Sequence, residues 1–395
     1  MSQNIFENFE NFWDENEIKQ KAKVYHSYFE DPEKKGDFSW VNEKDKDSLK
    51  KNNIEKSLKW GIPNHILGDI DKAKFIIGLL NPGTNMTKED AKKCETVGTY
   101  IKNEMNEEMG ENRELVIRTK EKKYKIPFPG SSKEVYEEKF NKELNIYDFY
   151  YNHIVDKENV LSQELKKLYK LYNDSIDVFE DLKNHKEEIE GNKIKHPFKK
   201  FAYYFSTYYK GCFDYNSKSS QIEVAICHYE RIFQKISEAK RKGNNKEIDQ
   251  KFEKALFNMP ISNIELIPYR TEKAPEIKFL ESSKVSANAI IEKIMQDKDT
   301  IVILRSYETK TYSWKKLFED ICEEKNINFK THIEPSIYIF KNKQGTALSA
   351  NSLKPVNRAN SIKSTKQVAK ELNESINLSD FKKELDNIIE ENNNM

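Results

Sequence analysis

The chain has 395 residues, of which 34% are charged and 37% hydrophobic, and its formal net charge is only +1. This length allows one large domain or two to three ordinary ones. The balanced charge excludes a uniformly basic nucleic-acid-binding protein, although it allows a local basic face. The apolar runs are about strand length, far short of the ~20 residues of a membrane helix. The acidic N-terminus also lacks the apolar centre of a secretory signal. We therefore expect a cytoplasmic protein.

The first third of the chain predicts helices followed by one buried strand. In residues 1–60, the aromatic residues Phe6, Phe9, Phe12 and Trp13 recur at helical spacing and indicate a packing stripe. The run 74–80 is continuously apolar and leads into Asn81-Pro82-Gly83, which is typical of a strand buried on both faces that ends in a tight turn. Thr87 and Asp90 resemble a capping box, and they predict a helix up to about Met109.

The remaining elements alternate between strand and helix after a long charged stretch. Residues 111–255 carry helical patterns, a turn containing Phe128 and an aromatic cluster from Phe201 to Tyr209. Further buried strands are predicted at 263–268, 300–304 and 336–340, with helices at 283–296 and 314–324 between them. This alternation predicts an α/β fold, with a four-stranded, mainly parallel sheet flanked by helices, a large helical insertion and terminal helices.

Changes in composition divide the chain into five segments. They are an N-terminal helical segment (1–60), the first part of an α/β domain (61–110), a helical insertion (111–255), the second part of the α/β domain with a basic loop (256–370) and an acidic C-terminal helix (371–395). Residues 341–370 carry seven basic side chains and no acidic one, whereas residues 371–395 carry seven acids and two lysines. The basic run favours contact with a polyanion over a solvated linker.

Polar residues follow the predicted strands, where ligands bind in parallel α/β sheets. They are Asn81 to Gly83 after the first strand, Asn263 at the second, Arg305 after the third and a Ser-rich loop after the fourth. The sequence shows no Ser–His–Asp order, no cysteine pair of metal-site spacing and no phosphate-binding loop. Asn amides can donate and accept hydrogen bonds at once, which suits the reading of a nucleobase edge.

These residues resemble the motifs of the uracil-DNA glycosylase superfamily. The sequence Leu-Leu-Asn-Pro-Gly at 79–83 resembles its motif 1, most of all in the branch of mismatch-directed thymine/uracil glycosylases. Residues 262–268 resemble its second strand, whose Asn reads the base, and residues 349–353 resemble its Ser-rich loop, which enters the DNA minor groove. The resemblance covers about 60–110 and 256–360.

The resemblance implies a monofunctional DNA glycosylase that cuts a flipped pyrimidine base from DNA without a metal or other cofactor, in base-excision repair or in antiviral defence. Asn81 would position the attacking water. Gly83 stands where uracil-specific members place a bulky Tyr, so the substrate base would carry a substituent at carbon 5. Asn263 would read the base and Phe128 would stack on it. The proposed DNA contacts are Ser349, Asn351, Ser352, Lys354, Arg358 and Arg305.

Each of these residues also has a purely structural interpretation. Asn81-Pro82-Gly83 is a common turn, Asn263 can bridge a strand end, and Arg305 can form a structural ion pair. The His of many Ser-rich loops is missing here, and Arg305 replaces a small Gly of the family. The alternative functions are therefore a nucleic-acid-binding module without catalysis and a helical interaction protein.

Overall fold

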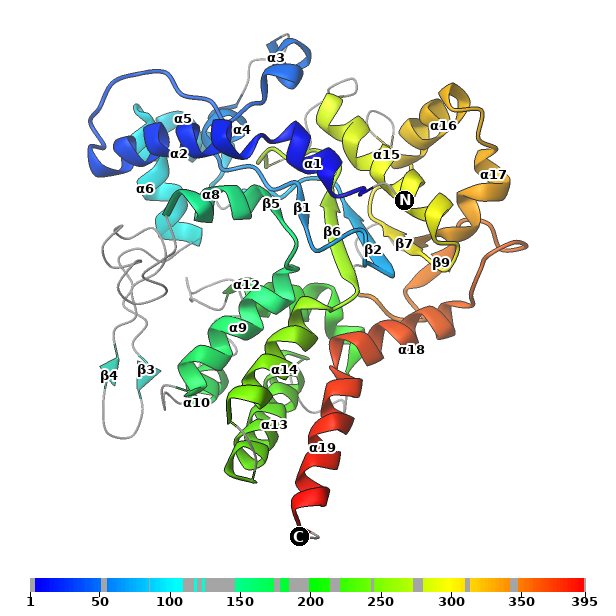
Figure 1. The fold of residues 1–395 in the computed structure, drawn as a ribbon. Helices are drawn as coiled ribbons and strands as arrows, with labels where there is room; N and C mark the ends of the chain where they lie inside the picture. The colour runs from blue at the N-terminus through cyan, green and yellow to red at the C-terminus, as the bar shows by residue number, and fades with distance from the viewer. Residues whose placement is uncertain are drawn as a thin grey trace.

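The computed structural model describes residues 4–50, 55–84, 86–108, 117–118, 123–124, 146–173, 178–184, 199–213, 221–242, 245–272, 280–309, 313–341 and 347–393. A seven-stranded sheet lies at its centre, and helices cover both faces (Figure 1). The strands are β1 (Ile66–Leu67), β2 (Phe75–Leu79), β5 (Val155–Asp156), β6 (Ile261–Glu265), β7 (Ile301–Leu304), β8 (Ile337–Phe340) and β9 (Leu353–Pro355). The chain is therefore α/β, as the alternation of elements predicted.

The prediction of a four-stranded, mainly parallel sheet was wrong. The sheet is mixed and its strand order is β5-β1-β6-β2-β7-β8-β9. The four predicted strands are β6, β2, β7 and β8, which are neighbours and run parallel. Three more strands extend the sheet, and β1 and β9 pair with it in antiparallel fashion. These strands have only two or three residues, which is too short for an apolar run or alternation to reveal them.

Strand β6 begins two residues earlier than predicted and ends at Glu265 instead of Pro268. Ile261 pairs with Phe75 at its start, and Glu265 pairs with Leu79 at its end. The N–H groups of Leu266 and Ile267 still donate to the backbone oxygens of Leu79 and Leu80, at 3.1 and 2.9 Å, and only Pro268, which has no N–H group, ends this donation. Asn263 consequently lies in the middle of the strand, opposite Ile77 of β2.

The first face of the sheet packs against the N-terminal helices and the helices of the C-terminal half. The predicted aromatic stripe is confirmed, because Phe6, Phe9, Phe12 and Trp13 are all buried in this core. The predicted helix after Thr87 is two helices, since the Thr96 hydroxyl accepts the N–H of Thr99 and starts a second one. The helices are α1 (Glu7–Phe12), α2 (Glu15–Glu30), α3 (Glu43–Lys50), α4 (Lys56–Trp60), α5 (Lys88–Lys93), α6 (Val97–Glu108), α8 (Ile146–Ile154), α15 (Glu281–Gln296), α16 (Trp314–Glu324) and α17 (Phe329–His332).

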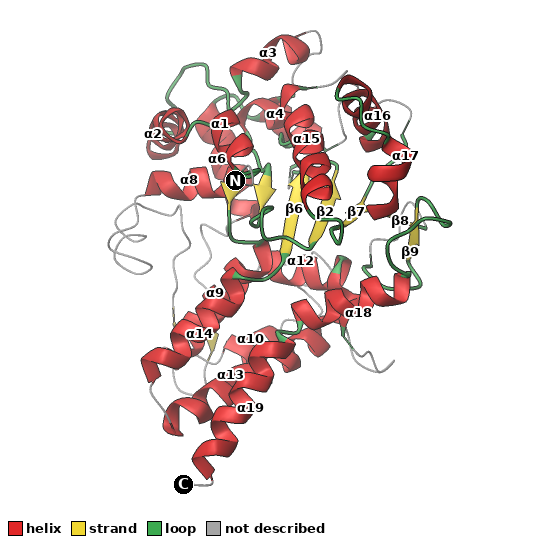
Figure 2. Ribbon diagram, turned by 45° about the vertical axis from the view of Figure 1, so that its right-hand side comes forward, coloured by secondary structure: helices red, strands yellow, loops and turns green. Residues whose placement is uncertain are grey.

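The second face packs against a helical layer formed by the insertion and the C-terminus. Figure 2 shows α12 directly beneath the sheet and the longer helices extending away from it. A separate small hairpin, β3 (Ile117–Arg118) with β4 (Lys123–Tyr124), also belongs to the insertion. The elements of this layer are α9 (Val160–Asn173), α10 (Val178–Asn184), α12 (Lys199–Thr207), η1 (Tyr209–Cys212), α13 (Gln221–Lys242), α14 (Asn245–Phe257), α18 (Thr365–Ile376) and α19 (Ser379–Asn393).

The acidic C-terminus packs on the insertion. Glu384 of α19 forms an ion pair with Lys251 of α14 at 2.9 Å, and Asp386 pairs with Lys235 of α13. The predicted closing helix is therefore present, running from Ser379 to Asn393. The segment 371–395, predicted as one helix, also contains the end of α18, whose start at Thr365 was not predicted although Ser364 and Gln367 form a capping box there.

Candidate active site at the carboxyl edge of the sheet

The turn after β2 carries Asn81 and is held by hydrogen bonds on both sides. Asn81 Nδ2 donates to the backbone oxygen of Thr271 at 2.9 Å, so Asn81 Oδ1 is the amide atom left to accept a hydrogen bond. The Thr84 hydroxyl donates to Glu104 Oε2 at 3.2 Å. Gly83 has φ of 67°, in the left-handed region that favours glycine, and a Cβ atom there would meet nothing within 4 Å.

A buried network anchors this turn to α6 and to the segment after β6. The Tyr100 hydroxyl donates to Glu104 Oε2 at 3.3 Å, and Arg270 Nη1 lies 3.7 Å from Glu104 Oε1. Arg270 Nε also donates to the backbone oxygen of Ile62 at 2.8 Å. Because Glu104 and Arg270 are each only 5% exposed, breaking this pair would leave a buried charge without its partner. The network therefore fixes the backbone on which Asn81 sits.

Strand β6 presents two polar side chains toward the second face of the sheet. Asn263 is 5% exposed and Glu265 is 6% exposed, while Ile264 between them points into the opposite core. The Tyr209 hydroxyl lies near the Asn263 side chain. In the described part of the chain, neither Tyr209 Oη nor Asn263 Oδ1 has a hydrogen-bond partner.

Glu265 is an acid with a strongly perturbed pKa at this edge. Burial raises its pKa to about 8, although the guanidinium groups of Arg305 and Arg270 act in the opposite direction. Its Oε2 atom is buried and has no hydrogen-bond partner among the described residues. The carboxyl is therefore mostly protonated at neutral pH and can both donate and accept a hydrogen bond.

Arg305 links the end of β7 to the insertion. Its backbone N–H donates to Gly78 of β2 at 2.8 Å, and its Nη1 donates to the Tyr208 hydroxyl at 3.2 Å. Ser306 follows with φ of 59°, a left-handed conformation that costs a non-glycine residue about 1–2 kcal/mol. The sharp turn at Ser306 leaves the Arg305 side chain on the second face, beside Glu265 and Tyr208.

The Ser-rich loop reaches the same edge through Tyr208. The backbone N–H of Leu348 donates to the backbone oxygen of Tyr208 at 2.7 Å. The Ser349 and Ser352 hydroxyl oxygens are 2.9 Å apart. Gly211 of η1 packs so tightly on this loop that a Cβ atom would come within 2.6 Å of the Ser349 Cβ. Asn351 at the loop tip is exposed.

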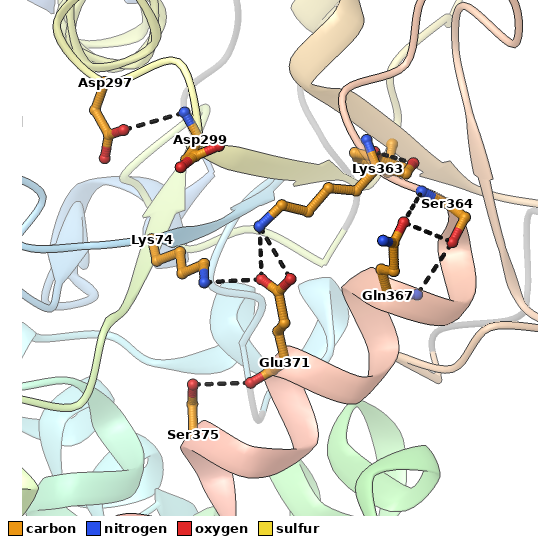
Figure 3. Close-up of polar contacts among 9 residues, drawn as sticks. Lys74, Asp297, Asp299, Lys363, Ser364, Gln367, Glu371 and Ser375 are labelled. Atoms are coloured by element: carbon orange, nitrogen blue, oxygen red, sulfur yellow. Dashed lines mark hydrogen bonds and ion pairs between the residues drawn. The ribbon is translucent and has the colours of Figure 1, made fainter.

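The basic run after this loop is divided between two ends of the sheet. Lys354 is half-buried in β9, and Arg358 is exposed beyond it. Lys363 instead joins an ion-pair network with Glu371 of α18 and Lys74, the residue before β2 (Figure 3). Its Nζ lies 2.7 Å from Glu371 Oε2, and the Lys74 Nζ lies 2.8 Å from the same oxygen. Lys363 is therefore already neutralised at the amino end of the strands.

The structure brings together some of the predicted site residues and leaves others apart. Asn81 and Arg305 lie at the carboxyl edge, and Tyr208 joins the loop of Ser349 and Ser352 to Arg305. Asn263 is buried four positions earlier along the paired strands than Asn81. Phe128 lies outside the described residues.

The sequence interpretation missed Glu265 and Tyr208. The signal for Glu265 was present, because it is the only acid inside the apolar run of residues 261–267. Burying an ionisable side chain in a strand that is covered on both faces costs free energy, so such a residue indicates a functional site. Tyr208 belongs to the aromatic cluster that the sequence had noted. Only the tertiary structure separates its core members, such as Phe205, from Tyr203, which is 43% exposed.

Among the described residues, no group of three or more His, Cys, Asp or Glu side chains is arranged to hold a metal ion. None of the helices described is long and apolar enough to cross a membrane. A scan against protein-family models, a search of curated proteins and a search of solved structures found no match.

Proposed function

We propose that the chain is a monofunctional DNA glycosylase, which hydrolyses the N-glycosidic bond of a flipped pyrimidine base and leaves an abasic site. One observation carries the proposal. The parallel strands β6, β2, β7 and β8 end at one edge, where the Asn81 turn, the Glu265 carboxyl and the Arg305 guanidinium follow each other. The motif order that resembles the uracil-DNA glycosylase superfamily supports the same function.

Asn81 would orient the water that attacks the sugar. Water adds across the bond: its oxygen bonds to C1′, and the base leaves with the electron pair of the C1′–N bond and later gains a proton. An amide is too weak a base to remove a proton early, but a dissociative reaction needs positioning more than deprotonation. Thr271 holds the Asn81 amide by Nδ2, which directs Oδ1 to the water.

The space around Gly83 supports a substrate base with a bulky substituent at carbon 5. A side chain at this position would have open space around it, so the glycine leaves room on that side of the site. A modified base of this kind favours defence against foreign DNA over routine uracil repair. DNA contacts would come from Ser349, Asn351, Ser352, Lys354 and Arg358, on the loop and strand beside the site.

The proposal is tested by base release from defined DNA. Single- and double-stranded oligonucleotides would carry uracil, thymine, cytosine, 5-hydroxymethyluracil or 5-hydroxymethylcytosine, and abasic sites would be scored by alkaline strand cleavage. The wild-type protein should release a 5-substituted base, and Asn81→Ala should lower the rate by about 100-fold or more, because the water loses its anchor.

Asn288→Ala is the matched control. Asn288 is also half-buried and also donates one hydrogen bond, to Glu292 at 2.9 Å, but it lies on α15, over the opposite core. Its variant should release base at the wild-type rate. If Asn81→Ala does the same, Asn81 has no role in the reaction. If the wild-type protein binds these DNAs and never releases a base, the binding-module alternative replaces the glycosylase.

A further inference from the structure

Three nearly fully buried polar side chains gather on the second face of the sheet without completing their hydrogen bonds. They are Asn263 and Glu265 of β6 and Tyr209 of η1, with 5%, 6% and 0% of their surface exposed. Over the described residues, Asn263 Oδ1, Glu265 Oε2 and Tyr209 Oη have no hydrogen-bond partner. Each such atom costs about 1–3 kcal/mol when it stays unsatisfied, so a persistent group of them points to a ligand that completes it.

The backbone places these side chains in one row. Asn263 and Glu265 are two residues apart in a strand, so they share a face, and Tyr209 lies over Asn263. Glu265 is paired with Leu79, only two residues before Asn81. Along the paired strands, the Asn81 turn is therefore followed by Glu265 and then by Asn263.

We propose that Glu265 is a base-recognition residue, which reads the hydrogen-bonding edge of the flipped pyrimidine together with Asn263. A neutral carboxyl group offers a donor and an acceptor side by side, and a pyrimidine presents the complementary pair at ring position 3 and the substituent at position 4. The unpartnered Asn263 Oδ1 adds an acceptor beside it. This inference rests on the proposed glycosylase function and names the residues that select its base.

The surroundings of Glu265 favour the neutral, protonated form of its carboxyl group. Four groups interact electrostatically with Glu265: Arg305 after β7, Arg270 after β6, Tyr204 of α12 and Tyr208. Arg270 is already engaged with Glu104, and Arg305 with the Tyr208 hydroxyl. The effect of burial is larger than that of the two cations, and it raises the pKa of Glu265 to about 8. Above that pH the carboxyl group loses its proton, and the resulting carboxylate can no longer donate a hydrogen bond.

The test compares Glu265→Gln and Glu265→Ala with the wild-type protein. Base release would be measured from about pH 6 to about pH 9 on the oligonucleotide that the wild type cuts. The Gln amide keeps a donor and an acceptor but does not titrate, so Glu265→Gln should retain activity and lose the alkaline decline. Glu265→Ala should lower base release at least about tenfold.

A binding measurement separates recognition from chemistry. By fluorescence anisotropy, Glu265→Ala should lose the preference for DNA with the target base over DNA with a tetrahydrofuran abasic analogue, while its affinity for the analogue stays unchanged. Glu164→Gln is the matched control. Glu164 is also a buried Glu with an unpartnered oxygen, but it lies on α9 in the helical layer, so this variant should behave as wild type.

The outcomes distinguish the two proposals. If the wild type releases a base and Glu265→Ala keeps its rate, base preference and pH profile, the inference on Glu265 is wrong and the glycosylase proposal stands. If Glu265→Gln is folded by circular dichroism yet as inactive as Glu265→Ala, a neutral carboxyl is not what reads the base. If the wild type releases no base from any of these DNAs, both proposals fall.

Discussion

The polar groups at the two ends of the central strands differ in whether they have hydrogen-bond and ion-pair partners. At the amino end, Glu371 accepts from both Lys363 and Lys74, and Asp299 closes a turn before β7 by donating its backbone N–H to Asp297 at 3.1 Å (Figure 3). At the carboxyl end, Glu265 is more deeply buried than Glu371, and its Oε2 has no hydrogen-bond partner in the described ranges. One acid is thus held charged by its neighbours, whereas the other is held neutral by its burial.

This contrast shows at which end of the strands the fold contains polar groups that lower its stability. The ion pairs at the amino end are partly exposed, and they add modestly to stability. The unpartnered groups at the carboxyl end reduce stability, and at a strand end that carries Asn81 and Arg305 they point to contact with a ligand or substrate. The three predictions below use the two ends as each other's control.

The largest effect is expected from Glu265→Gln on the pH dependence of stability. Glu265 has a raised pKa, so the folded state binds a proton that the unfolded state has lost between the ordinary value of 4.5 and about 8. Wild-type stability must therefore fall as pH rises through that window. Glu265→Gln should be more stable than wild type by about 2–4 kcal/mol at alkaline pH, and the difference should vanish near pH 4.5. Urea unfolding at several pH values measures it, and equal wild-type and variant curves at alkaline pH would contradict it.

Glu371→Gln should show the opposite sign and a smaller size. Burial alone would raise the pKa of Glu371, but Lys363 and Lys74 hold it below the ordinary value of 4.5. The ion pairs therefore stabilise the fold at neutral pH, and this contribution is lost as pH falls through that lowered pKa. The variant should lose about 1 kcal/mol at neutral pH and less in acid. Glu374→Gln, on the same helix with its Lys370 partner at 4.0 Å, should lose almost nothing.

The smallest effect concerns the affinity for DNA. Lys354 has no ion pair within the described ranges, and it lies in β9 next to the Ser-rich loop. Lys354→Ala should weaken DNA binding a few-fold and reduce the salt dependence by about one charge. Lys370→Ala, on α18 beside the ion pairs of the amino end, should leave both unchanged. Equal losses in the two variants would show that the basic run acts as a diffuse charge.

The sequence alone located the elements whose side chains are uniformly buried. The apolar runs at β2 and β7 predicted strands to within about one residue, because a strand covered on both faces needs apolar residues throughout. The run at β8 did so too, although Ile339 and Phe340 at its end are only half-buried. The stripe of Phe6, Phe9 and Phe12 predicted burial correctly for the same reason. The short strands β1, β5 and β9 escaped prediction, since pairing with distant partners creates them and no local pattern is required.

The candidate site divides along the same line. The local sequence determined that amides and cations follow the strands. It indicated Asn81, Gly83 and Arg305 because the residue types at a few consecutive positions determine where a turn forms. The tertiary structure decided what those groups meet: that Thr271 holds Asn81, that Tyr208 joins Arg305 to the Ser-rich loop, and that Glu371 neutralises part of the basic run. It also decided the raised pKa of Glu265, because the burial that keeps this carboxyl neutral comes from residues far away in the chain.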